Sequence, residues 1–418
     1  MTCSRQLHRP RRRPFLMGMV AAIGCLGSPV VHAQVVGMPE SLSPNKDAAP
    51  IRIGSVDVRP SVELGYGYDD NVTNAERGKI SSTFLLLSPE VSFEAEHGAS
   101  RYSLSYSGKS RRYIDSSRDD IDSNTLTLDG DHTFTTRTDL AWTLGYTDGA
   151  DARNSNDAAR DTTTPNEWET MQLGGTFGFG APGAQGRLEF DLGRNDKRYT
   201  NNREVTRRLD NTTDRVGARF FWRVGPKTRL LTEIQQAEID YDLRISDRNS
   251  TERSYYLGGT WEATAKTTGI VKLGRQTKKF EHDAAGRSDF SGFSWEAQMR
   301  WAPRTYSAFN IVTSRATQDS TAINSGVADY TVDQSYSVNW AHQWSGTLAT
   351  RAAWVLVDSE YQTSDRQEDV TKVLLAVDYR FSRWLGLSFD YTHQRRESTR
   401  DGIDYNKNLY MLTAKFAL

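Results

Sequence analysis

Hydrophobic and polar residues alternate along the chain most clearly between residues 330 and 344. One parity holds Tyr330, Val332, Tyr336, Val338, Trp340 and Trp344, and the other holds Thr331, Asp333, Ser335, Ser337, Asn339 and Gln343. Alternation with a period of two predicts a β-strand with one apolar and one polar face. The run is more than twice as long as an ordinary strand of about 5–6 residues. A break at 345–347 and a second alternating run from 348 to 356 complete a long amphipathic hairpin, the repeating unit of a membrane β-barrel.

The same hairpin pattern recurs from residue 58 to residue 418. Every second predicted strand ends at an aromatic residue just before a short turn, and the other connections are long and polar, as in 148–166 and 318–328. Eight short turns and nine long loops predict an all-β fold, a transmembrane antiparallel up-and-down β-barrel of about 18 strands. The aromatic residues before the short turns predict a girdle at one membrane interface: Phe93, Phe134, Phe179, Trp222, Trp261, Trp301, Trp344 and Phe381.

The spacing of the hairpins leaves one other architecture to weigh. A repeat of about 40 residues is also typical of a β-propeller. Each repeat here holds two strands of about 12 residues, whereas a propeller blade needs four shorter ones, so the pattern favours the barrel.

The mean hydropathy of −0.64 fits a wall whose inner half is polar, and no apolar run reaches the length of about 18 residues of a transmembrane helix. A barrel of about 18 strands is wide enough for a water-filled lumen.

The N-terminal segment has the pattern of a targeting sequence. Residues 1–33 combine a basic stretch at 9–13, an apolar stretch at 15–27 and small residues before Gln34, which predicts a cleaved signal peptide. Residues 34–56 hold three prolines and little alternation, so we expect an extended periplasmic lead-in that is either a linker or a partial plug of the lumen. Residues 57–418 are the predicted barrel.

Cleavage would change both the charge and the cysteine content. The segment carries five of the 52 lysines and arginines and none of the 53 acids, so the mature chain is acidic, which argues against a nucleic-acid partner. It also carries both cysteines, Cys3 and Cys25. The mature chain therefore has no disulfide and no thiolate metal site.

Parity along the strands assigns charged residues to the lumen. The acidic candidates are Glu90, Glu94, Glu96, Asp129, Asp131, Glu189, Asp191, Glu296 and Asp378, and the basic ones are Arg101, Lys109, Arg111, Arg187, Arg215, Arg219, Arg300, Arg351 and Arg380. The two signs interleave on neighbouring strands. We favour cross-strand ion pairing that stiffens the wall over a transverse field that orients a polar solute. Without a bias to one sign, strong ion selectivity is not expected.

The candidates for catalytic or metal chemistry are weak. The mature histidines are His97, His132, His282, His342 and His393, and none shares an inward face with a nucleophile. The run 69–71 has two acids and an asparagine but lacks the spacing of a calcium loop, so we interpret it as a solvated loop tip. We expect no cofactor, no metal and no enzyme activity.

The opening strand and its exit carry a family resemblance. Residues 59–72, and above all the run from Tyr68 to Asn71, resemble the start of the β-barrel porin 2 family of outer-membrane barrels. The chain departs from the usual aromatic end of such barrels, because it ends in Leu418 with Phe416 two residues before. Barrels similar to these often accompany exopolysaccharide synthesis and export.

Pattern and resemblance together suggest a porin-like channel for polar solutes in the outer membrane of a Gram-negative bacterium. Export of a polysaccharide is the narrower form of this expectation. The alternatives are a docking barrel that anchors a periplasmic export assembly and, with least support, a barrel enzyme. The implied partners are outer-membrane lipid, the barrel-assembly machinery, and possible polysaccharide and periplasmic export proteins.

Overall fold

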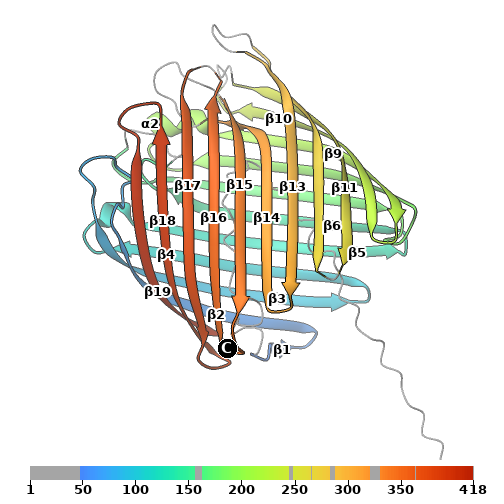
Figure 1. Cartoon of the computed structure of the whole chain (residues 1–418), viewed down its shortest axis with the longest axis horizontal. Helices are drawn as coiled ribbons and strands as arrows, with labels where there is room; N and C mark the ends of the chain where they lie inside the picture. Colours follow the sequence, from blue (N-terminus) through green and yellow to red (C-terminus); the bar gives the residue numbers. More distant parts are fainter. Residues whose placement is uncertain are drawn as a thin grey trace, which may run out of the picture.

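The chain folds into one closed antiparallel barrel (Figure 1). The computed structural model describes residues 48–155, 162–243, 248–264, 266–282, 288–320, 330–362 and 364–417. Each strand from β2 to β18 pairs with the next in sequence, and β19 pairs back with β2, which leaves 18 strands and no free edge in the wall. The predicted all-β class, strand number and up-and-down order are confirmed.

The strands are long and nearly uniform in length. Their bounds are β2 (Val56–Asp69), β3 (Ser82–His97), β4 (Ser100–Tyr113), β5 (Ile121–Thr135), β6 (Thr138–Asp151), β7 (Asn166–Phe179), β8 (Gly186–Tyr199), β9 (Asn211–Gly225), β10 (Thr228–Tyr241), β11 (Ser250–Thr264), β12 (Thr267–Phe280), β13 (Phe290–Arg304), β14 (Ser307–Asp319), β15 (Tyr330–Gln343), β16 (Leu348–Tyr361), β17 (Gln367–Arg380), β18 (Leu385–Ser398) and β19 (Tyr405–Ala417). Short turns follow β3, β5 and every second strand thereafter, and longer loops join the opposite ends. The strands extend further into the predicted loops 148–166 and 318–328 than the sequence indicated.

Helical structure in the described residues is confined to the loops. The loop after β4 contains η4 (Ser117–Asp119), and the loop after β8 contains α2 (Arg203–Thr206) and η5 (Arg207–Leu209). None of the described helices is long and apolar enough to cross a bilayer.

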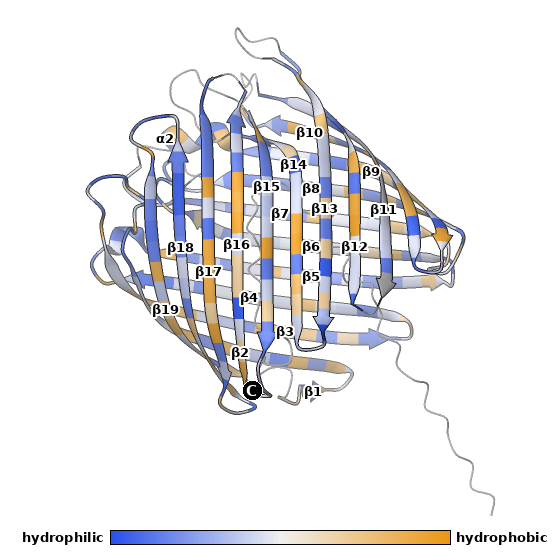
Figure 2. Cartoon of the chain, viewed as in Figure 1, coloured by the Kyte–Doolittle hydropathy of each residue, from blue (hydrophilic) through white to orange (hydrophobic). Residues whose placement is uncertain are grey.

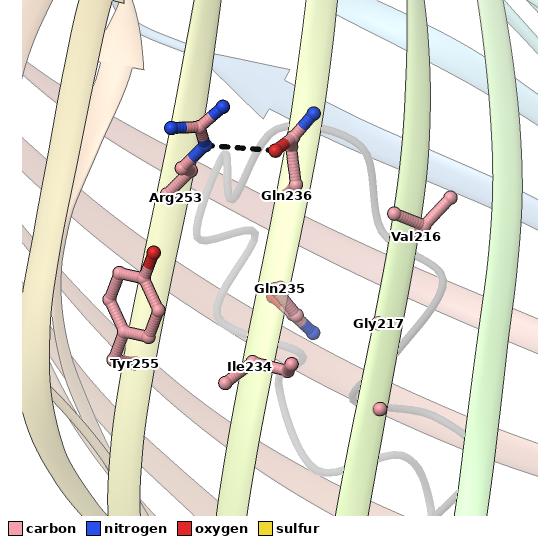
Figure 3. Close-up of a pocket in the computed structure, with 8 residues that line it drawn as sticks. Val216, Gly217, Ile234, Gln235, Gln236, Arg253 and Tyr255 are labelled. Atoms are coloured by element: carbon pink, nitrogen blue, oxygen red, sulfur yellow. Dashed lines mark hydrogen bonds between the residues drawn. The ribbon is translucent and has the colours of Figure 1, made fainter.

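The distribution of apolar and polar side chains over the two faces of the wall is the reverse of that in a soluble protein. Large apolar side chains of one parity are exposed, with Leu257 at 68%, while many charged and polar side chains of the other parity, such as Glu233 and Lys278, are buried. Figure 2 shows apolar and polar residues alternating along the strands. In Figure 3, Ile234 and Tyr255 project from one face of β10 and β11 and Gln235 from the other. A contiguous exposed apolar surface of this kind fits contact with lipid, so we call this parity the outer face.

The seam between β2 and β19 keeps the same parity. Phe416 is the partner of Val62 and Leu412 is the partner of Tyr66, and all four lie on the outer face. The alternation is therefore intact to the end of β19, although the chain lacks the usual terminal aromatic. Leu418 itself lies outside the described residues.

The predicted segments before the barrel are described only in part. Residues 1–33 and most of 34–56 lie outside the described residues. The end of the lead-in forms β1 (Ile51–Ile53), which turns at Gly54, with φ +62°, and pairs with the start of β2. The barrel wall begins at Val56, one residue before the predicted boundary.

The long-loop end of the β14–β15 hairpin leaves the wall. Pairing of β13 with β14 ends at Trp295 and Arg315. Beyond that point the Thr317 hydroxyl donates to Glu252 (2.9 Å), which lies on the face of β11 opposite to the exposed outer face. The Tyr330 ring packs against Phe280 and Phe290. The apolar face of 330–344 is thus exposed at Tyr336, Val338 and Trp344 and half-buried at Trp340. It is buried at Tyr330 and Val332, both 1% exposed, where the sequence predicted one lipid-facing side throughout.

Candidate functional site: the inner face of the barrel

The face opposite to the exposed apolar residues lines the lumen. Arg396 of β18 donates to the backbone oxygen of Asn154 (3.2 Å), in the loop after β6. The wall between these strands contains β19, β2, β3, β4 and β5, so the contact crosses the barrel. Arg396 shares its parity with Asp390, so both lie on the inner face of β18. Residues that pair across adjacent strands lie on the same face, so the register identifies the inner face of the neighbouring strands.

Five charged residues form a network on β6, β8 and β9 near the short turns. Arg187 contacts Asp139 (2.8 Å) and Glu189 (2.9 Å), and Arg219 contacts Asp191 (2.7 Å) and Glu189 (3.4 Å). The two arginines offset two of the three carboxylates, so the group keeps one net negative charge. Sequence parity identified all of these residues except Asp139, which the same rule would have found.

A second network joins β16, β17 and β18. Arg351 makes two parallel contacts with Asp378, from Nε to Oδ2 (2.7 Å) and from Nη2 to Oδ1 (2.8 Å). Its Nη2 also contacts Asp390 (3.1 Å). A bidentate pair of this geometry is among the stronger charge-assisted contacts, and Asp378 is fully buried beneath it.

The third network was only partly visible in the sequence. Lys272 of β12 lies between Glu296 (2.6 Å) and Glu233 (3.2 Å), and its ammonium lies 4.9 Å from the centre of the Tyr256 ring. Parity identified Glu296, while Lys272 and Glu233 were missed although they obey the same rule.

The remaining predicted lumen residues make smaller contacts or stand exposed. Pairs join Glu94 to Arg59 (2.7 Å), Glu90 to Lys415 (2.9 Å) and Glu96 to Arg101 (3.5 Å), Asp129 accepts from Thr143 (2.6 Å), and Arg380 donates to the Gly346 oxygen (2.6 Å). Asp131 is opposite Arg101 in the register. Arg215 is half-buried, and Arg300 is exposed at the short-turn end of β13. Lys109 and Arg111 lie apart from these pairs, near the long-loop end of β4.

The loop after β6 narrows the lumen near its long-loop end. Arg153 donates two hydrogen bonds to Asp119 of η4 (2.6 and 2.7 Å), and these bonds raise the pKa of Arg153 above its ordinary value. Asn74 of the β2–β3 loop donates to the Arg153 oxygen (3.0 Å), and Asn154 donates to the Thr73 oxygen (2.9 Å). With the contact to Arg396, these bonds fix residues 153–154 across the interior.

The Asp69–Asn71 run is buried, which overturns its interpretation as a solvated loop tip. Asp69 and Asn71 are both fully buried. Asp69 pairs with Lys407 of β19 (2.8 Å), and Asp70 accepts from the backbone and side chain of Asn408 (both 2.7 Å). The run that carries the family resemblance therefore joins the first strand of the barrel to the last. No cluster suited to a metal is present among the described residues.

The predicted girdle residues all lie near the short turns. Seven of them are exposed on the outer face, and Trp261 is half-buried. His342 lies among them, 4.2 Å from the Trp344 ring, and His132 lies 4.5 Å from the Phe134 ring. Aromatic residues at one level of the outer surface have the arrangement of an interfacial belt.

One Ser–His contact bears on the enzyme alternative. His132 Nδ1 lies 3.2 Å from the Ser100 hydroxyl and 2.9 Å from the Tyr102 hydroxyl. This outer-face group contains two hydroxyls and no carboxylate, so it lacks the acid that would orient a catalytic histidine. His393 contacts Asn408 (2.9 Å), again without a nucleophile.

The outer face also carries a shallow hollow over β9, β10 and β11. Its rim includes Val216, Ile234 and Tyr255, with a hydrogen bond from Arg253 to Gln236 (2.8 Å) at one side (Figure 3). The three large side chains are about half exposed on the face assigned to lipid. The hollow therefore lies outside the solute path.

Comparison with known proteins supports a porin-type barrel. A family model described as "Putative beta-barrel porin 2" matches residues 43–418, and no curated protein matches the sequence. Among solved structures, a BenF-like porin from Pseudomonas fluorescens Pf-5 is similar at 12% identity and a TM-score of 0.49, covering 88% of this chain and 100% of its own. OpdO from Pseudomonas aeruginosa is similar at 14% identity and a TM-score of 0.48, covering 87% of this chain and 98% of its own.

Proposed function

The chain belongs to the β-barrel porin 2 family and is a porin-like outer-membrane barrel, and from this premise we propose that it is a passive channel for small polar solutes. One observation carries the proposal: the wall is closed, apolar outside, and lined inside by charged and polar side chains. Large barrels of this kind leave an aqueous path unless they are plugged.

The inward segments limit the size of the solute. Residues 153–154 cross the interior, and the end of the β14–β15 hairpin covers the inner face of β11–β13. Both obstructions lie in the half nearer the long loops. This arrangement supports a channel for small solutes over a wide, unselective pore.

Polysaccharide export is the narrower form of the proposal, and it rests on the family resemblance alone. A polymer would need periplasmic partners to deliver it and a continuous path past residues 153–154. The barrel-assembly machinery and outer-membrane lipid are the partners that the location implies.

The test is conductance and solute uptake by the purified barrel. In planar bilayers we expect stable single-channel steps, and in liposome swelling we expect uptake of small sugars that declines as sugar size increases. Equal uptake of large oligosaccharides would favour the polymer path instead. A barrel that inserts correctly yet passes neither ions nor sugars would overturn the channel and favour the docking alternative, in which deletion of the lead-in, residues 34–56, abolishes secretion.

A further inference from the structure

Most charges on the inner face are neutralised by neighbours, but one group of cations is not. Lys109 and Arg111 lie two positions apart on the inner face of β4, and Lys372 lies on the inner face of β17. All three are in the half of the barrel nearer the long loops. The wall between β4 and β17 contains β3, β2, β19 and β18, so the side chains approach one another from separate parts of the lining.

The two lysines have no direct partner. No acceptor among the described residues lies within hydrogen-bond or ion-pair distance of Lys109 or Lys372, and Lys109 is exposed to the lumen. Glu63 attracts Lys109 only at longer range. Three other lysines of the lining, Lys272, Lys278 and Lys415, each pair with at least one carboxylate.

Arg111 is held by contacts that leave its charge uncompensated. Its guanidinium lies 4.7 Å from the centre of the buried Phe84 ring and donates to the Tyr113 hydroxyl (3.3 Å). Its Nε is buried without a hydrogen-bond partner among the described groups. Tyr113 donates in turn to Asp69, and that carboxylate already pairs with Lys407.

The nearest acid on the inner face of β17 is also occupied. Glu368 lies two inner-face positions before Lys372, but it accepts from Arg396 (2.8 Å) and from Nε of Arg366 (2.7 Å). One carboxylate between two guanidiniums leaves a positive balance. Glu368 and its two arginines together therefore add one positive charge to this region.

The cations lie close enough to repel one another. Arg111 repels both lysines, Lys372 repels Lys109, and Lys407 repels Lys372. Like charges at short range cost free energy that an anion between them would recover. The packing of Arg111 on Phe84 holds its guanidinium in place without such an anion, and the strand register fixes the points from which the two lysines enter the lumen.

We propose that Lys109, Arg111 and Lys372 form a binding site in the lumen for small oxyanions that bear carboxylate or phosphate groups. The inference rests on the proposed channel function and narrows it, because it makes anionic solutes the preferred cargo. It also revises the expectation of weak ion selectivity, since the interleaving of signs fails at these residues. A guanidinium beside two ammonium groups suits an anion with several oxygen atoms.

The first test is ion selectivity in planar bilayers under a KCl gradient. We expect the wild-type reversal potential to show preference for chloride. Replacing both lysines (Lys109→Gln with Lys372→Gln) should reduce the chloride-to-potassium permeability ratio by roughly twofold or more. Lys227→Gln, in an exposed short turn, should leave the ratio unchanged. A channel whose ratio is insensitive to both lysines would overturn the anion site and leave the channel intact.

The second test does not depend on conduction. Folded protein in detergent is acetylated on its lysines with and without pyrophosphate or citrate at matched ionic strength, and labelling is quantified by mass spectrometry. Either anion should protect Lys109 and Lys372 but not Lys227, and protection by only one would identify its oxygen chemistry as the preferred one. Equal labelling with and without both anions would overturn the site. Because labelling reports on a silent barrel too, loss of conductance and loss of the anion site are distinguishable.

Discussion

Lys278 and Asp319 tie a wall strand to the hairpin that folds in front of it. The Lys278 ammonium on β12 lies 2.7 Å from Asp319 at the end of β14 and 3.0 Å from Glu252 on β11, and its side chain is fully buried. These contacts fall where β14 has left β13, so they replace the lost strand pairing as the link between the hairpin and the wall.

Replacing Lys278 should destabilise the barrel strongly. Lys278→Met leaves the half-buried carboxylates of Asp319 and Glu252 without their cation, a change that we expect to cost about 3 kcal/mol, the lower end for breaking a buried pair. The neighbouring Lys279→Met is the matched control, because Lys279 is exposed on the opposite face and should change stability by about 0.5 kcal/mol or less. Urea unfolding in lipid vesicles, followed by tryptophan fluorescence, measures both. Similar losses for the two variants would show that Lys278 does not fasten the hairpin.

Releasing the loop after β6 should widen the channel. Arg153→Ala removes the two hydrogen bonds to Asp119 that anchor residues 153–154. We expect a larger single-channel conductance and entry of sugars that the wild type excludes. Arg118→Ala is the control, since Arg118 is an exposed arginine next to Asp119. If conductance and sugar cut-off do not respond to Arg153→Ala, residues 153–154 do not limit the pore.

Strand alternation was sufficient to predict the architecture because it determines which side chains share a face. The 18 strands, the two kinds of connection and most inner-face charges follow from that periodicity. Even the missed residues obey it: Lys372 has the parity of Asp378, six positions later, and Lys272 has the parity of Lys278, also six positions later.

Periodicity does not determine what each face contacts, and this is why some of the predictions made from the sequence were wrong. Tyr330 and Val332 continue the apolar face of β15, yet that face packs inside the barrel because β14 separates from β13. Asp69 and Asn71 look like loop residues, yet their partners lie on β19, more than 300 residues later. Contacts between distant segments have no local signal in a single sequence.

The pair of Arg351 and Asp378 should couple strongly. Asp378→Asn removes the carboxylate that makes the bidentate contact with Arg351 in a buried site. We expect the free energy of unfolding to fall by about 3–5 kcal/mol. The double variant Arg351→Met with Asp378→Asn should lose less than the sum of the two single losses, because either single change already breaks the bidentate pair; the contact of Arg351 with Asp390 is lost equally in both variants that lack Arg351. Arg383→Met, in an exposed turn, serves as the control. Additive losses in a double-mutant cycle would contradict a direct interaction.

The assignment of one parity to lipid and the other to water can be tested with single cysteines. The only cysteines of the sequence are Cys3 and Cys25, both in the segment predicted to be cleaved, so an introduced thiol in the mature barrel has no competitor. Ser105 is on the inner face of β4 and the adjacent Leu104 is exposed on the outer face. In lipid vesicles, Ser105→Cys should react with a small charged thiol reagent, because the reagent reaches the lumen through water. Leu104→Cys should be protected, because the hydrocarbon of the bilayer excludes the reagent. After solubilisation in urea both should react at similar rates, which controls for intrinsic reactivity. Reversal of the order in vesicles would place lipid on the charged face, and neither the channel nor the anion site could then be maintained.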